Sequence, residues 1–299
     1  MKNSRKKTGF LGKILILFSI VLAIFAGGYF FLDKLIVPKY FKQYGINNVP
    51  DLVGVVTSLY KSPKESKLVK NGYTQNDVSS AIKILRDANY NIAEDGTIEK
   101  NVPFKGDKQV SLTDREFAGI CNKLIENGIL VDALPNLNYL NVINISILEL
   151  NIEPNKEKAI LDGTGYNSAK ISFIAKIDTT DIREQIATQM NTPIFLLNMI
   201  IPEKLYFSVS YDLDLTKSES ERVENGTIAI NGRTEKQSQI LIDLLIDFIF
   251  PEEEHMDITK FTNTLGDVIL EGIDTLGEFK FADNLGVNKN RTGIIADPN

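Results

Sequence analysis

The sequence has one cysteine, one histidine and no tryptophan. Because Cys121 stands alone, no disulfide can form within the chain and the fold must be stable through packing. No cysteine lies near the N-terminal apolar segment to carry a thioether-linked lipid. Any imidazole-dependent catalysis would have to use His255, and no G-x-S-x-G, P-loop or G-x-G-x-x-G motif occurs. We therefore expect neither an enzyme nor a bound nucleotide or other cofactor.

Basic residues are also scarce outside the N-terminus. The net charge is −6, and because the first 32 residues carry five basic and no acidic side chains, residues 33–299 carry a net charge of −11. Nucleic acids and anionic lipid headgroups are recognised through clustered Lys and Arg side chains. The acidic body is therefore not expected to bind nucleic acid, and only the basic tail, residues 1–13, suits phospholipid headgroups.

One long apolar run dominates the N-terminal part. Residues 14–32, ILILFSIVLAIFAGGYFFL, contain no charge, and at about 1.5 Å per residue a helix of this length nearly matches a hydrocarbon core of roughly 30 Å. The alternative is a cleaved signal peptide, with Ala26 and Gly28 as the small residues of a cleavage site. The run continues past that site through Leu32, beyond the usual length of a signal's apolar region. An uncleaved signal-anchor is the preferred interpretation.

The charges that flank this run predict its orientation. Five basic residues precede it, whereas Asp33 partly offsets the basic residues that follow it. Basic flanks stay cytoplasmic. We expect a single-pass cell-membrane protein with residues 1–13 in the cytoplasm, residues 14–32 in the membrane and the remainder extracytoplasmic.

Two amphipathic helices with capped N-termini are predicted. One begins at Thr74 and places apolar residues at 78, 81, 82 and 85 on one face. The other begins after Thr113, which forms a T-x-x-E capping box with Glu116, and carries an apolar face that includes Phe117 and Cys121. That position explains Cys121 as a core residue rather than a reactive thiol.

Alternating apolar and polar residues predict strands at 139–150, 168–178, 204–215 and 226–232. The alternation shifts near Leu148, as it does at a β-bulge. Alternation with one apolar face is typical of an antiparallel sheet covered on one side. The fold class is therefore α+β, with at least four antiparallel strands packed on amphipathic helices.

The remaining segments complete the predicted organisation. A helix is expected near 181–190, a buried apolar connector at 193–202, and two final helices at 240–250 and 258–277. The turn-rich stretch 94–108 is interpreted as an internal boundary. We thus expect a stalk with a small helical region at 33–104, an α+β ectodomain at 105–281 and a flexible tail at 282–299.

Two acidic groups could carry chemistry. Residues 251–257, PEEEHMD, could hold a divalent cation, but acidic residues also suit the linker that precedes a helix N-terminus. Asp243 and Asp247 lie four residues apart on one helical stripe, which fits a solvated stripe as well as a carboxylate pair. In both places the structural interpretation is preferred, so no metal site is predicted.

The order of basic tail, membrane helix, SLTDREFAGICNKLI helix, antiparallel meander and final helices resembles the membrane-anchored ectodomains of low-GC Gram-positive bacteria. Some of these look like single halves of the TULIP, or tubular lipid-binding, superfamily. The resemblance covers residues 105–281 and implies a long helix inside a curved sheet, without catalytic residues. The helix near 181–190 departs from that pattern.

The anchor and the apolar faces lead to two functional hypotheses. The first is a tethered, non-enzymatic extracytoplasmic domain that binds a lipid or another apolar ligand between sheet and helix, although the same residues could form plain core. The second is a bitopic envelope scaffold that acts through protein–protein contacts. The expected ligand-binding residues are Phe117, Phe173, Phe207, Tyr211, Leu245 and Phe248.

Overall fold

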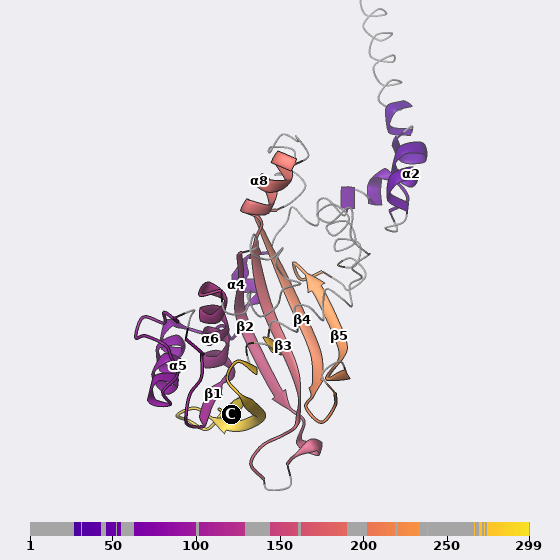
Figure 1. The fold of residues 1–299 in the computed structure, drawn as a ribbon. Helices are drawn as coiled ribbons and strands as arrows, with labels where there is room; N and C mark the ends of the chain where they lie inside the picture. Colours follow the sequence, from indigo (N-terminus) through magenta and orange to yellow (C-terminus); the bar gives the residue numbers. More distant parts are fainter. Residues whose placement is uncertain are drawn as a thin grey trace, which may run out of the picture. The chain divides into compact units, whose positions relative to one another are not determined.

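The computed structural model of the chain forms two compact units, residues 1–58 and 59–299 (Figure 1). The residues that it describes are 27–30, 32–42, 46–51, 53–54, 63–99, 102–128, 144–160, 163–189, 202–218, 221–233, 238, 266, 269–270, 272 and 274–298. The division falls at residue 58, not within 94–108, because the helical region after residue 63 packs on the α+β body.

The smaller unit contains a π-helical turn, η1 (Leu32–Ile36), that continues into α2 (Val37–Phe41). Pro38 has no N–H to donate and its ring crowds the carbonyl four residues earlier, and a wide π-turn is one way to relieve that conflict. Asp33 and Val37 are buried, and the backbone N–H of Val49 donates to the Asp33 carboxylate at 2.8 Å. Residues 46–51 thus pack against one side of this helix.

The predicted membrane anchor begins outside the described residues. Of residues 14–32, the structure describes 27–30 and 32, and they are helical. Within the described part of the chain, no helix is both long and apolar enough to cross a bilayer. The anchor and its orientation stay predictions.

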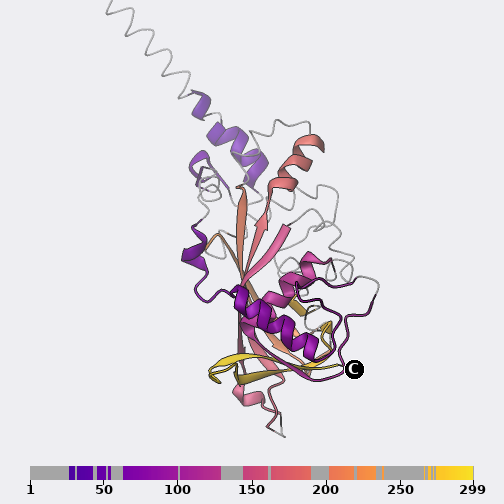
Figure 2. The ribbon, with the colours of Figure 1, turned by 90° about the vertical axis from the view of Figure 1, so that its left-hand side faces the viewer.

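The two predicted capped helices of the larger unit are confirmed. After the short α4 (Glu65–Leu68), α5 (Gln75–Asp87) begins at a capping box formed by Thr74 and Asp77, and its four predicted apolar residues are buried. Helix α6 (Asp114–Glu126) begins at the predicted Thr113–Glu116 capping box. The two helices lie side by side (Figure 2). A β-carbon at Gly119 of α6 would stand 2.9 Å from the Val78 side chain, so this close packing requires glycine.

The main sheet has the predicted strands in sequence order. β2 (Asn144–Pro154), β3 (Ser168–Asp178), β4 (Lys204–Asp214) and β5 (Val223–Ile230) are all antiparallel (Figure 1). The register of β2 against β3 shifts between Ile147 and Glu149, which confirms the bulge predicted at Leu148. Ile145 and Ile147 are buried before the bulge and Leu150 after it, so the bulge reverses which positions of β2 face inward.

The connections between these strands agree with the prediction where they are described. A short 3₁₀ turn, η4 (Lys156–Lys158), follows β2, and α8 (Thr180–Gln189) follows β3, as expected for 181–190. The predicted segments 139–143, 193–201 and 240–250 lie outside the described residues. In the predicted final helix, residues 266, 269–270, 272 and 274 are described and helical.

A second sheet corrects the prediction of a flexible C-terminal tail. β1 (Val110–Thr113), β6 (Glu278–Leu285) and β7 (Arg291–Asp297) pair antiparallel in the order β1-β7-β6. The fold therefore ends with an ordered strand, β7, in which Ile294 and Ala296 are fully buried. Its partner β1 lies some 180 residues earlier in the chain, and no local pattern identifies so distant a partner. Gly293 permits the pairing, because a β-carbon there would stand 2.0 Å from the Leu112 carbonyl oxygen.

One buried amide joins α6 to the edge of the main sheet. The Nδ2 group of Asn122 donates to the Ile147 carbonyl at 2.7 Å, and its Oδ1 accepts from the Ile147 N–H at 2.7 Å. The same Nδ2 group lies 2.9 Å from the hydroxyl of Tyr73. The side chain thus replaces a neighbouring strand at this point of β2, where a buried and unpaired edge would be unfavourable.

Replacing Asn122 with leucine should leave both backbone groups of Ile147 without these partners while they stay buried. We expect Asn122→Leu to lower the free energy of unfolding by about 3 kcal/mol, the range for stranded buried polar groups. Denaturant titration followed by circular dichroism measures it. Asn76→Leu, on the exposed side of α5, is the matched control and should change stability by less than about 0.5 kcal/mol. Equal effects of the two changes would contradict the role given to Asn122.

Candidate functional site

The inner face of the main sheet holds three of the residues expected to bind an apolar ligand. Phe173 of β3 and Phe207 and Tyr211 of β4 are each at most 3% exposed. The rings of Phe173 and Tyr211 meet edge to face, with centroids 6.4 Å apart. Gly266 lies against the Tyr211 ring, where a β-carbon would stand 3.4 Å away. The structure therefore brings these residues together as core.

The other three expected residues are not all described. Phe117 is fully buried on α6, and Leu245 and Phe248 lie outside the described residues. The hollow described next lies on the opposite face.

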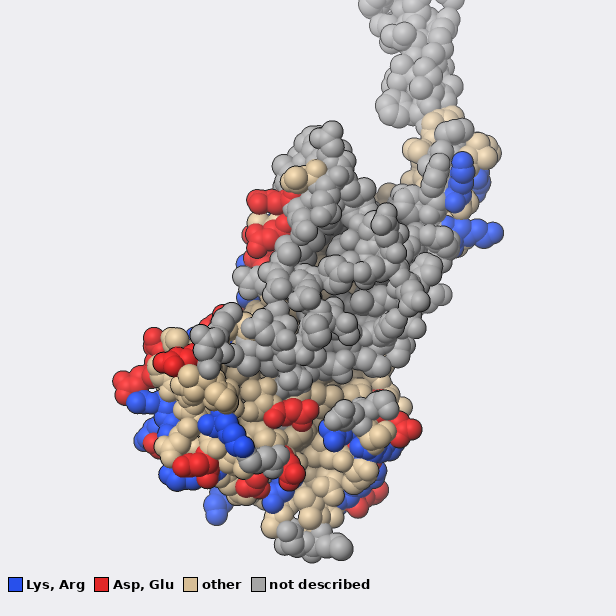
Figure 3. Space-filling model, viewed as in Figure 1, with Lys and Arg blue, Asp and Glu red and all other residues tan. Residues whose placement is uncertain are grey.

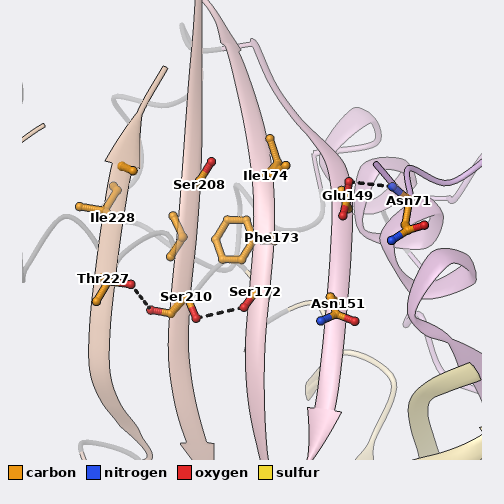
Figure 4. Close-up of a pocket in the computed structure, with 12 residues that line it drawn as sticks. Asn71, Glu149, Asn151, Ser172, Phe173, Ile174, Ser208, Ser210, Thr227 and Ile228 are labelled. Atoms are coloured by element: carbon orange, nitrogen blue, oxygen red, sulfur yellow. Dashed lines mark hydrogen bonds between the residues drawn. The ribbon is translucent and has the colours of Figure 1, made fainter. Parts of the chain in front are cut away.

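The outer face of the sheet carries a hollow of about 500 Å³. Its size falls in the range of small-ligand sites. Because side chains alternate along a strand, the residues between the buried aromatic ones point to this side (Figure 4). The lining residues are Asn71, Glu149, Asn151, Ser172, Phe173, Ile174, Ser208, Val209, Ser210, Thr227, Ile228 and Ala229.

Hydroxyl groups form a row across the floor of the hollow. The Oγ atoms of Ser172 on β3 and Ser210 on β4 lie 3.0 Å apart, and either can donate. The Thr227 hydroxyl on β5 points to the Ser210 carbonyl at 3.5 Å, a long contact (Figure 4). Since Ser172 and Ser210 are directly paired across the ladder, the row follows from strand register. Their half-exposed hydroxyls can donate to a ligand or accept from it.

Residues 63–73, which we name the strap, cross the same outer face and border the hollow. Near one end, the Glu65 carboxylate lies 3.4 Å from the Tyr206 hydroxyl and 3.9 Å from the Lys176 ammonium. Near the other, the backbone N–H groups of Lys70 and Asn71 donate to Glu149 Oε2 at 2.6 and 3.0 Å. The strap is thus held by carboxylates at both ends.

The electrostatics of the hollow follow from its composition. Glu149 is the single charged residue in the lining, and one of its oxygens already accepts two N–H groups. In the view of Figure 3, acidic and basic side chains are interspersed over the larger unit instead of forming a field of one sign. A hollow of this kind has no cation with which to bind a phosphate or carboxylate.

A partly buried ion pair lies at the end of β4. Asp214 accepts hydrogen bonds from the Lys158 ammonium, from the Thr216 hydroxyl and from the Thr216 N–H. These donors, Lys158 first, lower the pKa of Asp214 from 3.8 to about 2. The pair joins η4 to the sheet and lies outside the hollow.

Reactive groups are few in the described part of the chain. Cys121 is completely buried, as predicted, and burial raises the pKa of its thiol. No group of His, Cys, Asp and Glu side chains among the described residues could hold a metal ion. The acidic segment 251–257 and the pair Asp243 and Asp247 lie outside those residues.

No protein-family model, curated protein or solved structure matches this chain. The resemblance to tubular lipid-binding halves therefore stays a prediction. The site must be interpreted from its own residues.

One feature of the sequence could have predicted the polar face that carries the hollow. Serines occupy the outward positions 172, 208 and 210 of two predicted strands, so a hydroxyl-bearing outer face could have been inferred from the same alternation that predicted the inner face. The contact between the strap and Glu149 could not have been inferred from the sequence, because Asn71 and Lys70 lie 78 and 79 residues before Glu149 in the chain.

Removing the Glu149 carboxylate should free one end of the strap. In Glu149→Ala, the N–H groups of Lys70 and Asn71 lose their acceptor, and we expect their amide hydrogens to exchange at least several-fold faster. Hydrogen–deuterium exchange of peptides that cover residues 69–73 measures this. Glu153→Ala, on the exposed side of the same strand, should leave the exchange of these peptides unchanged. Unchanged exchange in Glu149→Ala would contradict the proposed restraint.

The Asp214 ion pair should make the stability of the protein depend on pH in the acidic range. Its folded pKa is about 2, below its ordinary value of 3.8, so its contribution is complete above pH 3.8 and is lost as the pH falls through about 2. Asp214→Asn should be less stable than the wild type near neutral pH, and the difference should shrink toward pH 2. Thermal unfolding at a series of pH values measures it. Lys158→Met removes the main donor and should also reduce the loss of stability at acidic pH. An unchanged pH dependence in both variants would refute the role given to Asp214.

Proposed function

We propose that this chain is a membrane-tethered, extracytoplasmic, non-enzymatic binding domain, and that the hollow on the outer face of β2–β5 binds a neutral, hydroxyl-rich ligand of the oligosaccharide class. The observation that supports the proposal most directly is the row of serine and threonine hydroxyls across an open hollow of about 500 Å³. The tether is the apolar segment 14–32.

The lining favours a neutral ligand over an anion. Lys and Arg side chains are absent from the lining residues, and anion sites rely on such groups or on free backbone N–H donors. The N–H groups of Lys70 and Asn71 beside the hollow are already engaged by Glu149. An anionic headgroup or phosphate would therefore find little compensation for its lost hydration.

The lining also favours a ligand that both donates and accepts hydrogen bonds. Hydroxyl and amide side chains do both, and they are supplied here by Ser208, Ser210 and Asn151 among others. Ile174 and Ala229 add an apolar patch beside them. A sugar ring combines hydroxyl groups with an apolar C–H face, and so matches both parts of this lining.

Filling the hollow should abolish ligand binding without unfolding the domain. We expect purified full-length chain in detergent micelles to bind members of an array of neutral oligosaccharides. Ser210→Phe should lower that binding at least tenfold, because the ring would occupy the floor of the hollow. Ser79→Phe, on the exposed side of α5, is the matched control and should bind like the wild type.

Two other outcomes would overturn the proposal in favour of the earlier hypotheses. Absence of glycan binding together with a lipid that co-purifies in native mass spectrometry would indicate an apolar ligand, for which Phe173, Phe207 and Tyr211 on the inner face are the specific structural support. If neither ligand binds and a protein partner is captured only when residues 14–32 are present, the chain would instead be a bitopic scaffold.

A further inference from the structure

Exposed apolar side chains are concentrated in the smaller unit. Among the described residues, seven large hydrophobic side chains are exposed, and five of them belong to residues 1–58, of which only 23 are described. Val102 and Val287 are the two in the larger unit. The five are Tyr29 (49%), Phe30 (64%), Leu32 (47%), Leu35 (55%) and Val53 (52%). Such a concentration marks an interaction surface.

The helix that carries most of these residues is covered on one side only. Asp33 and Val37 are one helical turn apart and buried, and the Asp33 carboxylate holds the N–H of Val49 from the segment packed on that side. Leu32 and Leu35, three residues apart, are half exposed instead. In the folded unit, one face of this helix is therefore packed, and an apolar stripe stays exposed on another face.

Basic side chains accompany this stripe. Lys34 is 59% exposed and pairs with Asp33 at 2.9 Å, and Lys39 and Lys42 are exposed beyond it. In the view of Figure 3, basic side chains lie beside uncharged surface on the smaller unit. Lysines next to exposed apolar residues suit the boundary between lipid headgroups and acyl chains, because the stem lies along apolar surface while the ammonium reaches the phosphates.

The position of the stripe in the chain identifies its partner. The predicted membrane segment ends at Leu32, and the helix continues beyond that residue through η1 and α2. Leu35 lies within one turn of the predicted membrane boundary, and Tyr29 is an aromatic residue of the kind enriched there. A stripe that continues directly from a membrane segment is adjacent to the bilayer by chain connectivity alone.

We propose that residues 27–42 include an interfacial collar: Leu32 and Leu35 enter the boundary between headgroups and acyl chains on the outer side of the bilayer that holds residues 14–32, and Lys34, Lys39 and Lys42 contact its phosphates. This inference rests on the proposed tether but goes beyond it, because a simple anchor would leave the helix after residue 32 in water. The collar would hold the smaller unit against the membrane.

The absence of tryptophan from the chain allows a direct test. Three single-tryptophan variants are compared: Leu35→Trp in the collar, Phe30→Trp inside the predicted membrane segment, and Val287→Trp, fully exposed between β6 and β7 of the larger unit. Each full-length variant is reconstituted into phosphatidylcholine vesicles with and without brominated acyl chains. Bromine quenches only a tryptophan that reaches the acyl region.

The expected result is at least twofold quenching for both Leu35→Trp and Phe30→Trp, and none for Val287→Trp. Quenching of Phe30→Trp alone would overturn the collar while leaving the tether intact. If neither Phe30→Trp nor Leu35→Trp is quenched, the tether itself fails and the collar with it. Quenching of all three variants would show non-specific adsorption and would also overturn the collar.

Discussion

The larger unit depends on the paired hydrogen bonds between the Asn122 amide and the backbone of Ile147. Helix α6 begins directly after β1 of the small sheet, and Asn122 ties it to the edge of the main sheet. Both sheets therefore contact this helix. Because the amide is buried, water cannot replace its bonds, and the contact specifies a single arrangement.

The bulge next to this contact gives the outer face its character. Before Leu148 the odd positions of β2 face inward, and after it the even positions do. Glu149 and Asn151 therefore point outward, where Glu149 holds the strap and Asn151 lines the hollow. Without the extra residue, Glu149 would face the apolar core, which it could enter only at a high desolvation cost. One inserted residue thus places polar side chains on the outer face and keeps the inner layer apolar.

The two proposals assign separate tasks to the two units. The smaller unit exposes apolar and basic side chains suited to a lipid surface, whereas the larger unit exposes hydroxyls suited to a soluble, neutral ligand. Three of the aromatic residues expected to hold a lipid are buried in the inner layer. Apolar alternation along a strand indicates a buried face, and core and ligand groove share that pattern, so the lipid site stays a prediction.

The local features of this protein follow from short stretches of its sequence. The two capping boxes, the buried faces of α5 and α6, the four strands and the bulge at Leu148 all depend on residues within a few positions of one another, so their patterns are visible in the chain. The pairing of β7 with β1, the strap contact at Glu149 and the division at residue 58 become visible only in the folded structure. These features join residues that are far apart in the chain or follow from the packing of whole elements, and composition does not identify such partners. The C-terminal residues illustrate the difference, because they resemble a tail until their distant partner strand is known.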